Sequence, residues 1–408
     1  MAHQDQLSEW FAMVSTNFPC LSRPQAHVLA LWSYGIVMTR CCGRTTVAAF
    51  LALLLHRKAA SLNQQLQEWL LPASAKAGAK RGIKRATLEV TTCFVPLLAW
   101  VLRLWHTTTL ALAIDATTLQ DRFTLLVVSV VYRGCAIPVA WRVLPSGQKG
   151  SWRAAWLKLL RQLRPAIPPN ISVLVLADRG LYAGWLFRRI VRLGWHPFLR
   201  VNAHTTFRPS GRARWYRLRD LVPRLGDRWQ GSGTAFKTAG SQLRCTLAAC
   251  WEAGYAEPWC VLTDLAPSAC ESVWYGLRSW CEQGFKCLKR GAWMWQHTRM
   301  SDPERVARLG LALALATLWM LSVGSEIEVV LSEPGLPELQ GVLQQSARRP
   351  RQRQVRVLRL GVMWLMVQVL QGQSVPLPRM LLPEAWPSPP ARPHLPLLLE
   401  DALHVPVS

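Results

Sequence analysis

Apolar residues divide the chain into a helical first part and a middle part that is rich in strands. Up to residue 104 they recur at helical spacing, as in 26–38 and 45–55. Three apolar segments rich in β-branched residues follow one another at 109–119, 122–134 and 135–145. Short runs of this kind, punctuated by Gly and Pro, predict strands. The pattern therefore changes from helix to strand near residue 105.

The next residues alternate between the two patterns. A helix, a buried strand, an amphipathic helix and another strand are expected in turn at 150–165, 171–180, 181–194 and 197–202. Three hairpin-linked strands followed by this alternation predict a mixed sheet with helices against its faces. Asp115 stands at the expected end of the first strand and Asp178 just past the fourth. If these strands are neighbours, the two acids meet at one edge of the sheet.

Charge adds a partner to this picture. Lys and Arg number 48 against 23 Asp and Glu, which makes a formal charge of +25 and a pI near 10.6. A folded protein with this imbalance attracts polyanions, so nucleic acid is the expected partner. The longest apolar run, 309–324, is shorter than the roughly 20 residues that cross a bilayer. We expect it to form a buried helix, and we expect no membrane partner.

Two further features concern the compartment. The N-terminus carries early acids and lacks the basic-then-apolar order of a secretory signal, so a cytoplasmic protein is expected. The 11 cysteines include no C-x-x-C pair. Spacings of this kind fit no common zinc site and predict reduced structural thiols.

The remaining sequence has two other textures. Residues 203–264 are polar, basic and rich in turns, with strand-like segments, and indicate a β-rich insertion. Prolines after residue 375 exclude regular structure and indicate a tail. We therefore expect a helical DNA-binding domain, a first part of the sheet core, the insertion, a second part of the core, a basic helical region and a Pro-rich tail, at 1–104, 105–202, 203–268, 269–330, 331–374 and 375–408.

Three acids far apart in the chain are candidates for one metal site. Phosphodiester chemistry with two divalent ions about 4 Å apart needs several carboxylates that converge on one point. Asp115, Asp178 and Glu282 would form such a set if folding brought their carboxyl groups within about 4 to 8 Å. Taken singly, an acid at a strand end is more often a turn or cap residue. Asp264, at the end of another expected strand, is the strongest rival.

The stretch around Glu282 combines this carboxylate with basic residues. Tyr275, Arg278, Glu282 and Lys289 share one face of an expected α-helix. A solvated helix with an Arg278–Glu282 ion pair, worth a few tenths of a kcal/mol, is the simplest interpretation. However, this Y-x2-R-x3-E-x6-K spacing, together with "AIDATTL" and "LVLADRGL" around the two aspartates, resembles the IS4-type DDE transposases of bacterial insertion sequences.

The resemblance covers roughly residues 105–320 and implies a ribonuclease H-like core, with the insertion before the helix of the glutamate. In that family the residues matched by Asp115, Asp178 and Glu282 bind two Mg²⁺ or Mn²⁺ ions. The implied reaction is cleavage by water at the transposon end. The freed 3′ hydroxyl then attacks the opposite strand to form a hairpin, and later the target DNA.

The resemblance also implies the partners. Tyr275, Arg278 and Lys289 match residues that hold DNA phosphates near the cut. Double-stranded DNA, both transposon ends and target, and a second copy of the chain in a homodimer are expected, in the bacterial cytoplasm at the nucleoid. Two rival interpretations stay open: a catalytically inactive DNA-binding protein of transposase ancestry, and a ribonuclease H-like nuclease without strand transfer.

Other residues are weaker candidates for DNA contacts. Trp215 and Trp229 lie in the polar insertion and could stack on a flipped base, although most of the 21 tryptophans should be core. Arg200 and Arg179 are next to the expected catalytic strands, where ion pairing competes with phosphate contact. The basic run 347–359 is either a solvated linker or a contact with donor DNA or a second protomer.

Overall fold

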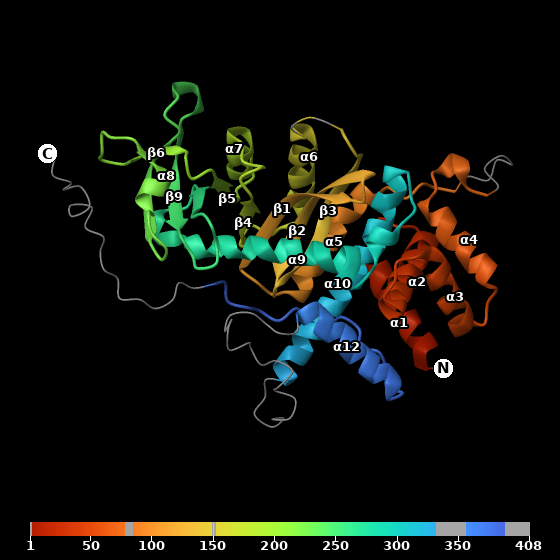
Figure 1. The fold of residues 1–408 in the computed structure, drawn as a ribbon. Helices are drawn as coiled ribbons and strands as arrows, with labels where there is room; N and C mark the ends of the chain where they lie inside the picture. The colour runs from red at the N-terminus through yellow and green to blue at the C-terminus, as the bar shows by residue number, and fades with distance from the viewer. Residues whose placement is uncertain (1, 78–84, 149, 151, 332–355, 388–408) are drawn as a thin grey trace.

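The computed structural model describes residues 2–77, 85–148, 150, 152–331 and 356–387. It is a mixed α/β structure built around a ten-stranded sheet, in the order β3-β2-β1-β4-β5-β10-β9-β8-β6-β7. The N-terminal helices lie at one end of this sheet, and β6, β8 and β9 lie at the other (Figure 1).

Strands β1 to β5 form the part of the sheet that the hydrophobic pattern predicts. β2 pairs antiparallel with β1 and β3, whereas β1, β4 and β5 are parallel to one another. The elements are β1 (Thr109–Leu119), β2 (Phe123–Tyr132), β3 (Cys135–Pro145), α6 (Arg153–Leu163), β4 (Ser172–Ala177), α7 (Gly184–Arg192) and β5 (His196–Val201). The expected mixed sheet with helices is confirmed.

Strands β6 to β10 extend the same sheet. β10 pairs antiparallel with β5, and β9, β8 and β6 follow outward, each antiparallel to the strand before it. The elements are β6 (Thr206–Pro209), β7 (Tyr216–Arg217), α8 (Leu218–Leu221), β8 (Arg228–Ala235), β9 (Leu243–Cys250) and β10 (Trp259–Thr263). The polar segment between β5 and α9 therefore continues the core sheet, because β10 occupies the otherwise open edge of β5.

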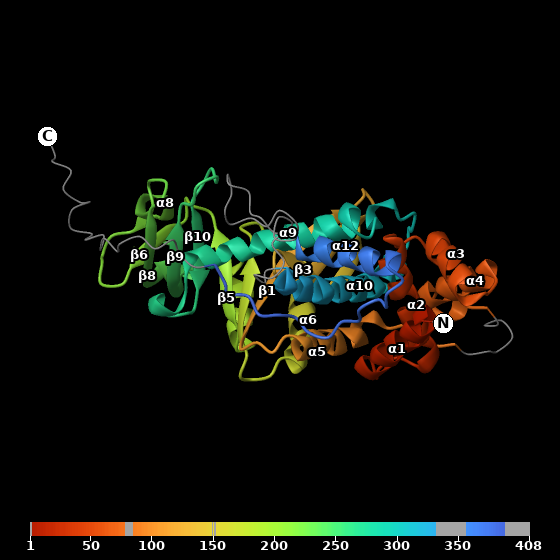
Figure 2. The same cartoon turned by 90° about the horizontal axis from the view of Figure 1, so that it is seen from below.

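Helices cover both faces of the sheet. α5 and α6 lie on one side and α9 on the other, as Figure 2 shows. α9 packs on β1, β2 and β3, and α10 packs on β3. Their bounds are α5 (Phe94–Leu104), α9 (Arg278–Lys286), α10 (Pro303–Val330) and α12 (Val357–Leu370).

α10 is the central helix of the molecule. It is long and apolar enough to cross a membrane by length and composition, but its most apolar window is 94% buried inside the protein. The prediction of a buried helix for 309–324 is confirmed. Trp319 of α10 packs against Trp10, whose ring also meets Trp100, with centroid distances of 4.5 and 5.6 Å. These tryptophans are core residues, as expected for most of this residue type.

The N-terminal helices pack around this aromatic cluster. α2 begins where Ser22 and Gln25 form a capping box, which satisfies backbone N–H groups of the first turn. The bounds are α1 (Ala2–Asn17), α2 (Arg23–Thr39), α3 (Arg44–Leu55) and α4 (Ala59–Leu70). The structure pairs none of the eleven cysteines in a disulfide.

The described part of the Pro-rich segment is packed against the protein, and the rest of the expected tail, 388–408, lies outside the described residues. Residues 373–387 have no regular structure, as their prolines require. Trp319 donates from its indole N–H to the carbonyl of Pro376 at 2.6 Å, and the Tyr132 hydroxyl donates to Leu382 O at 2.9 Å. Prolines prevent helix and sheet here, but they do not prevent docking. The basic run 347–359 lies mostly outside the described residues.

Candidate active site

The register of β1 and β4 brings Asp115 and Asp178 to the same edge of the sheet. The parallel ladder runs to Ala113 opposite Leu176, two residues before each aspartate. Asp115 lies within β1, which continues to Leu119 beside β2, so its expected place at the strand end is wrong. β1 is longer than the parallel ladder because the β1–β2 hairpin extends beyond it. Asp178 directly follows β4, as predicted.

Local hydrogen bonds fix both carboxylates. Asp115 Oδ1 accepts from the backbone N–H of Ala116 at 2.9 Å. Asp178 Oδ1 accepts from the N–H of Gly180 at 2.5 Å, in the turn that leads to α7. These bonds leave Oδ2 of each aspartate directed to other partners.

Close packing of α9 on the sheet positions Glu282. A Cβ on Gly284 would lie 2.9 Å from Cβ of Ala136 in β3, so a side chain there would push the helix away. Cys281 and Phe285 are buried on the same helix. Glu282, on the opposite side of this contact, keeps a side chain that is 55% exposed. The helix thus presents the third carboxylate at the rim of the sheet.

Arg278 joins the three acids. Its Nη2 lies 3.0 Å from Oδ2 of Asp115 and 3.7 Å from Oδ2 of Asp178, and its Nη1 donates to Oε1 of Glu282. The separation of the two aspartate oxygens cannot exceed the sum of these two distances, which lies within the range expected for paired ions. The structure therefore brings Asp115, Asp178 and Glu282 together around the guanidinium of Arg278, whose side chain is only 10% exposed.

The donor set suits a hard divalent cation, although the guanidinium now lies among the donors. Carboxylate oxygens are the ligands that Mg²⁺ and Mn²⁺ prefer. In the part of the chain that the structure describes, no three His, Cys, Asp or Glu side chains surround a common point closely enough to hold a metal ion. The Arg278 guanidinium occupies the position between the three carboxylates. The three acids therefore fit a divalent ion in their chemistry and in their place at one edge of the sheet, but not in their present spacing.

Burial and charge set the protonation of this cluster. Burial raises the pKa of Asp115, the Arg278 charge opposes this rise, and the carboxylates of Asp178 and Glu282 add to it. Burial lowers the pKa of Lys289, while the charge of Asp115 partly restores it. The Lys289 ammonium donates to Thr117 Oγ1 of β1 at 2.6 Å. Lys289 therefore faces the carboxylate edge, as the shared helix face predicts.

The stretch from Tyr275 to Lys289 is not one α-helix, which corrects the expected geometry. Tyr275 lies in a 3₁₀ segment (Ser272–Leu277) and Lys289 in a π-helical turn (Cys287–Gly291), with α9 between them. Both still approach the site: the Tyr275 ring lies beside Arg200, and Lys289 donates to Thr117 of β1. Residue spacing alone could not predict the 3₁₀ and π turns.

Tyr275 links the site to β5. The ring is buried, the Arg200 guanidinium lies 5.7 Å from its centroid, and burial raises the pKa of the Tyr275 hydroxyl to about 12. Arg200 also lies 3.7 Å from Glu257, which pairs with Arg179 at 2.8 Å. Glu257 is a residue that sequence reasoning missed. It precedes an antiparallel strand, and only the pairing of β10 with β5 carries it to the carboxylate edge.

Asp264, the rival acid, lies at the other edge of the sheet. β10 runs antiparallel to β5, so the end of β10 meets the start of β5. There Asp264 Oδ1 is 3.1 Å from Nδ1 of His196, and the pair raises the pKa of the imidazole. Asp264 has a structural partner and does not join the other three acids.

The two candidate tryptophans occupy different places. Trp229 pairs across β8 and β9 with Ala249, which leads through Cys260 to Val201, beside Arg200. Trp229 therefore lies at the same level along the strands as the carboxylate edge. Its strand, β8, is three strands beyond β5, which is a distance of roughly 14 Å between β8 and β5. Its ring packs on Phe207 at 5.6 Å.

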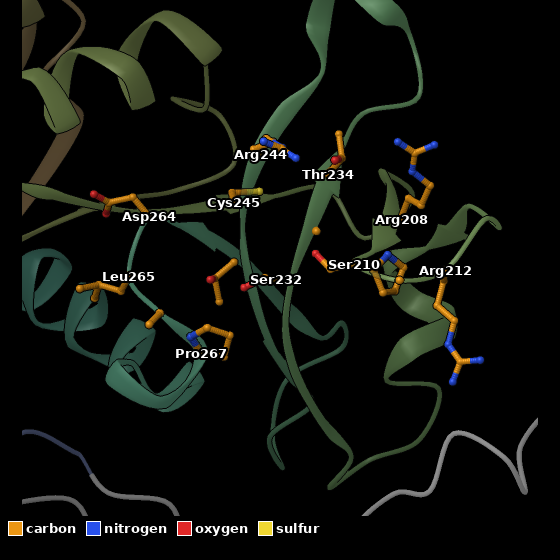
Figure 3. A pocket seen from close by; sticks show the side chains of 15 residues that line it. Arg208, Ser210, Arg212, Ser232, Thr234, Arg244, Cys245, Asp264, Leu265 and Pro267 are labelled. Atoms are coloured by element: carbon orange, nitrogen blue, oxygen red, sulfur yellow. The ribbon is translucent and has the colours of Figure 1, made fainter.

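Trp215 precedes β7 and contacts Arg208, which lines a groove on the extended sheet. The guanidinium of Arg208 lies 5.0 Å from the Trp215 ring. The groove, of about 910 Å³, is lined by the β6–β7 turn, β8, the start of β9 and the loop after β10, with Arg208, Arg212, Arg244, Ser232 and Thr234 among its residues (Figure 3). No carboxylate of the described chain forms an ion pair with these three arginines.

A comparison with family models matches this architecture. Residues 107–319, more than half of the chain, match the transposase DDE domain. The chain belongs to this family. The matched region begins just before β1 and ends within α10, so it includes Asp115, Asp178 and Glu282. Membership in the DDE domain family indicates transposase activity. No curated protein matches the chain.

Proposed function

We propose that this protein is an IS4-type transposase that cleaves DNA strands at transposon ends and joins them to target DNA. The observation that carries the proposal is the convergence of Asp115, Asp178 and Glu282 on Arg278, in a chain with a DDE domain and a charge of +25. These acids come from β1, the end of β4 and α9. Three carboxylates at one point suit the binding of metal ions. The large positive net charge of the chain suits the binding of a polyanion such as DNA.

A ribonuclease H-like core is part of the proposal. The strand order β3-β2-β1-β4-β5, with only β2 antiparallel, supports it. The placement of two acids on adjacent parallel strands and a third on a helix across one face supports it too. The strands β6 to β10 would then be the insertion between the core and the helix of the glutamate.

Asp115, Asp178 and Glu282 would hold two Mg²⁺ or Mn²⁺ ions. Bound there, the ions would supply Lewis-acid stabilisation of the attacking and leaving oxygens of a phosphodiester. The role of the protein is to fix the three carboxylates through the sheet register and the close packing of α9. Asp115, the most buried of the three, sets the inner limit of the site.

Tyr275, Arg278 and Lys289 would hold phosphates next to the cut. Lys289 and Arg278 provide positive charge at the carboxylate edge, and charged donors of this kind position a DNA backbone without reading its sequence. Arg200, which contacts the Tyr275 ring, extends this basic surface towards β10. A cut-and-paste pathway with a hairpin intermediate would place the freed 3′ hydroxyl against these residues twice.

The basic groove of the extended sheet would contact DNA outside the cleavage site. Arg208, Arg212 and Arg244 suit phosphate oxygens, and the ring of Trp215 could stack on an unpaired base. Trp229, in line with the carboxylate edge, is better placed for a base flipped during hairpin formation. Two copies of the chain would hold paired ends as a homodimer at the bacterial nucleoid.

The test is cleavage of DNA that carries the sequences flanking the coding region on both sides. With Mg²⁺ the protein should release this segment and join it to a second plasmid. Asp115→Asn, Asp178→Asn and Glu282→Gln should each abolish both steps. Asp264→Asn, which removes a carboxylate at the other edge, serves as the matched control and should retain activity.

The products separate the rival functions. Binding without any cleavage in Mg²⁺ or Mn²⁺ would favour an inactive DNA-binding protein. Cleavage without joined products would favour a nuclease without strand transfer. A hairpin end, detected as a strand of doubled length on a denaturing gel, would establish the proposed pathway.

A further inference from the structure

Arg278 occupies an unusual position for a residue that is expected to hold DNA. Its guanidinium contacts Asp115, Asp178 and Glu282, and among the described basic groups it is the one that contacts all three. Burial by itself would lower the pKa of the Arg278 guanidinium, but its interactions with Asp115, Tyr275 and Asp178 together raise that pKa. The side chain is therefore a permanent cation inside the carboxylate cluster.

The charge balance explains why a cation is needed there. Three carboxylates that approach one point repel one another, and the two aspartates are partly buried. One guanidinium offsets part of this repulsion through charged hydrogen bonds. The guanidinium carries a single positive charge, so divalent ions at the same place would offset more of the repulsion among the three carboxylates.

The fit of Arg278 is also incomplete. Its Nε is buried and has no hydrogen-bond partner, although both terminal nitrogens are engaged. A buried donor without a partner costs free energy. Arg278 is therefore held by the carboxylates and not by a full set of hydrogen bonds, which suits a group that leaves when a stronger competitor arrives.

We infer that Arg278 fills the cation position of the metal-free protein and leaves it when metal ions and DNA bind together. This inference rests on the proposed function. Metal binding then requires displacement of the guanidinium, which lowers the apparent metal affinity of the free protein. DNA phosphates accept the displaced guanidinium, so DNA binding tightens metal binding. By linkage, metal tightens DNA binding by the same factor.

The consequence is a protein that loads its metal ions mainly on DNA. Arg278 would act as a positioning residue, since it controls the occupancy of the carboxylates. Lys289, the other cation near Asp115, bonds Thr117 and does not contact the three acids in the described structure. It therefore cannot take over the position of Arg278 without moving.

Calcium binding to the full chain tests the inference without any catalytic readout. Isothermal titration with Ca²⁺ in the absence of DNA should show roughly tenfold tighter binding to Arg278→Gln than to the unchanged protein. Arg200→Gln is the matched control, because it removes the same charge close by from a residue whose carboxylate partner is Glu257. It should change calcium affinity by less than about threefold.

A second pair of measurements guards against misfolding. In EDTA, Arg278→Gln should melt at a lower temperature than the unchanged protein, and Ca²⁺ should raise its melting temperature by more. Arg278→Lys should give an intermediate calcium affinity, because an ammonium keeps the charge but cannot bridge three carboxylates as a guanidinium does. Circular dichroism that matches the unchanged protein establishes that the variants are folded.

The outcome also separates this inference from the proposed function. Equal calcium affinity for the unchanged protein and folded Arg278→Gln would overturn the inference. If Asp115→Asn also left calcium affinity unchanged, the carboxylate site itself would be refuted. A short DNA duplex should tighten calcium binding to the unchanged protein, and the ratio of calcium affinities between Arg278→Gln and the unchanged protein should fall by the same factor. A ratio that stays constant when DNA is added would contradict the exchange of Arg278 between the carboxylates and DNA.

Discussion

The two edges of the sheet place acidic residues in similar sequence settings but in different chemical ones. At one edge, Asp115, Asp178 and Glu282 converge on Arg278. At the other, Asp264 follows an apolar strand just as Asp178 does, but it pairs with His196 alone. An acid after a strand is therefore not informative by itself. Strand direction decides which acids can meet, and the antiparallel β10 sends Asp264 away from the others.

Removing one carboxylate from each edge should produce the largest contrast. Asp115→Asn should lower the rate of strand cleavage by at least about a thousandfold, because ion-mediated stabilisation is worth several kcal/mol. Asp264→Asn should change it by less than about threefold, since this substitution removes only a partly exposed pair. Single-turnover cleavage of end-bearing DNA measures both. Equal decreases in rate would erase the distinction between the edges.

Two Gly→Ala substitutions, one near each edge, compare how tightly the backbone is packed there. Gly284→Ala should destabilise the fold by about 1–3 kcal/mol and slow cleavage, because its Cβ would overlap Ala136 and displace α9. Gly240, in the turn before β9, has no atom within 4 Å of an added Cβ, so Gly240→Ala should be nearly neutral. Urea denaturation reports the difference. Unchanged stability of Gly284→Ala would show that α9 can move without cost.

The basic groove beside Asp264 should influence DNA affinity through electrostatics. The binding constant falls as salt rises, and Arg244→Gln should make this negative log–log slope shallower by about 0.9 for each DNA phosphate that the arginine neutralises. The exposed Arg161 of α6 lies outside the groove, and Arg161→Gln should leave the slope unchanged. Fluorescence anisotropy with a labelled duplex over a salt series gives these slopes. Identical slopes would remove the groove from the DNA path.

The smallest effect concerns pH. Asp264 raises the pKa of His196 above its ordinary value of 6.5 in the folded protein. The pair therefore stabilises the fold fully below pH 6.5, and this contribution disappears as pH rises through the raised pKa. The difference in unfolding free energy between the unchanged protein and Asp264→Asn should be below about 1 kcal/mol, because both groups are partly exposed. It should be larger at pH 6 than at pH 8.

Much of the core could be predicted from apolar periodicity. The strands β1 to β5 and the helices between them appear in the expected order, since each is marked by its own spacing and by flanking Gly or Pro. The packing of residues 373–387 could not be predicted, because prolines exclude helix and sheet but do not indicate whether a segment docks on the protein. The 3₁₀ and π turns around α9 could not be predicted from the sequence either, since they depend on how the helix packs against β3.

The sequence by itself determined the local identity of the site: a tyrosine, an arginine, a glutamate and a lysine at set spacings, and two aspartates beside apolar strands. These features depend on neighbours along the chain, which residue order specifies directly. Only the tertiary structure decided that Arg278 lies among the three acids, that Glu257 reaches the same edge and that Asp264 does not. Those outcomes depend on strand register and direction, which arise from pairing between segments tens of residues apart.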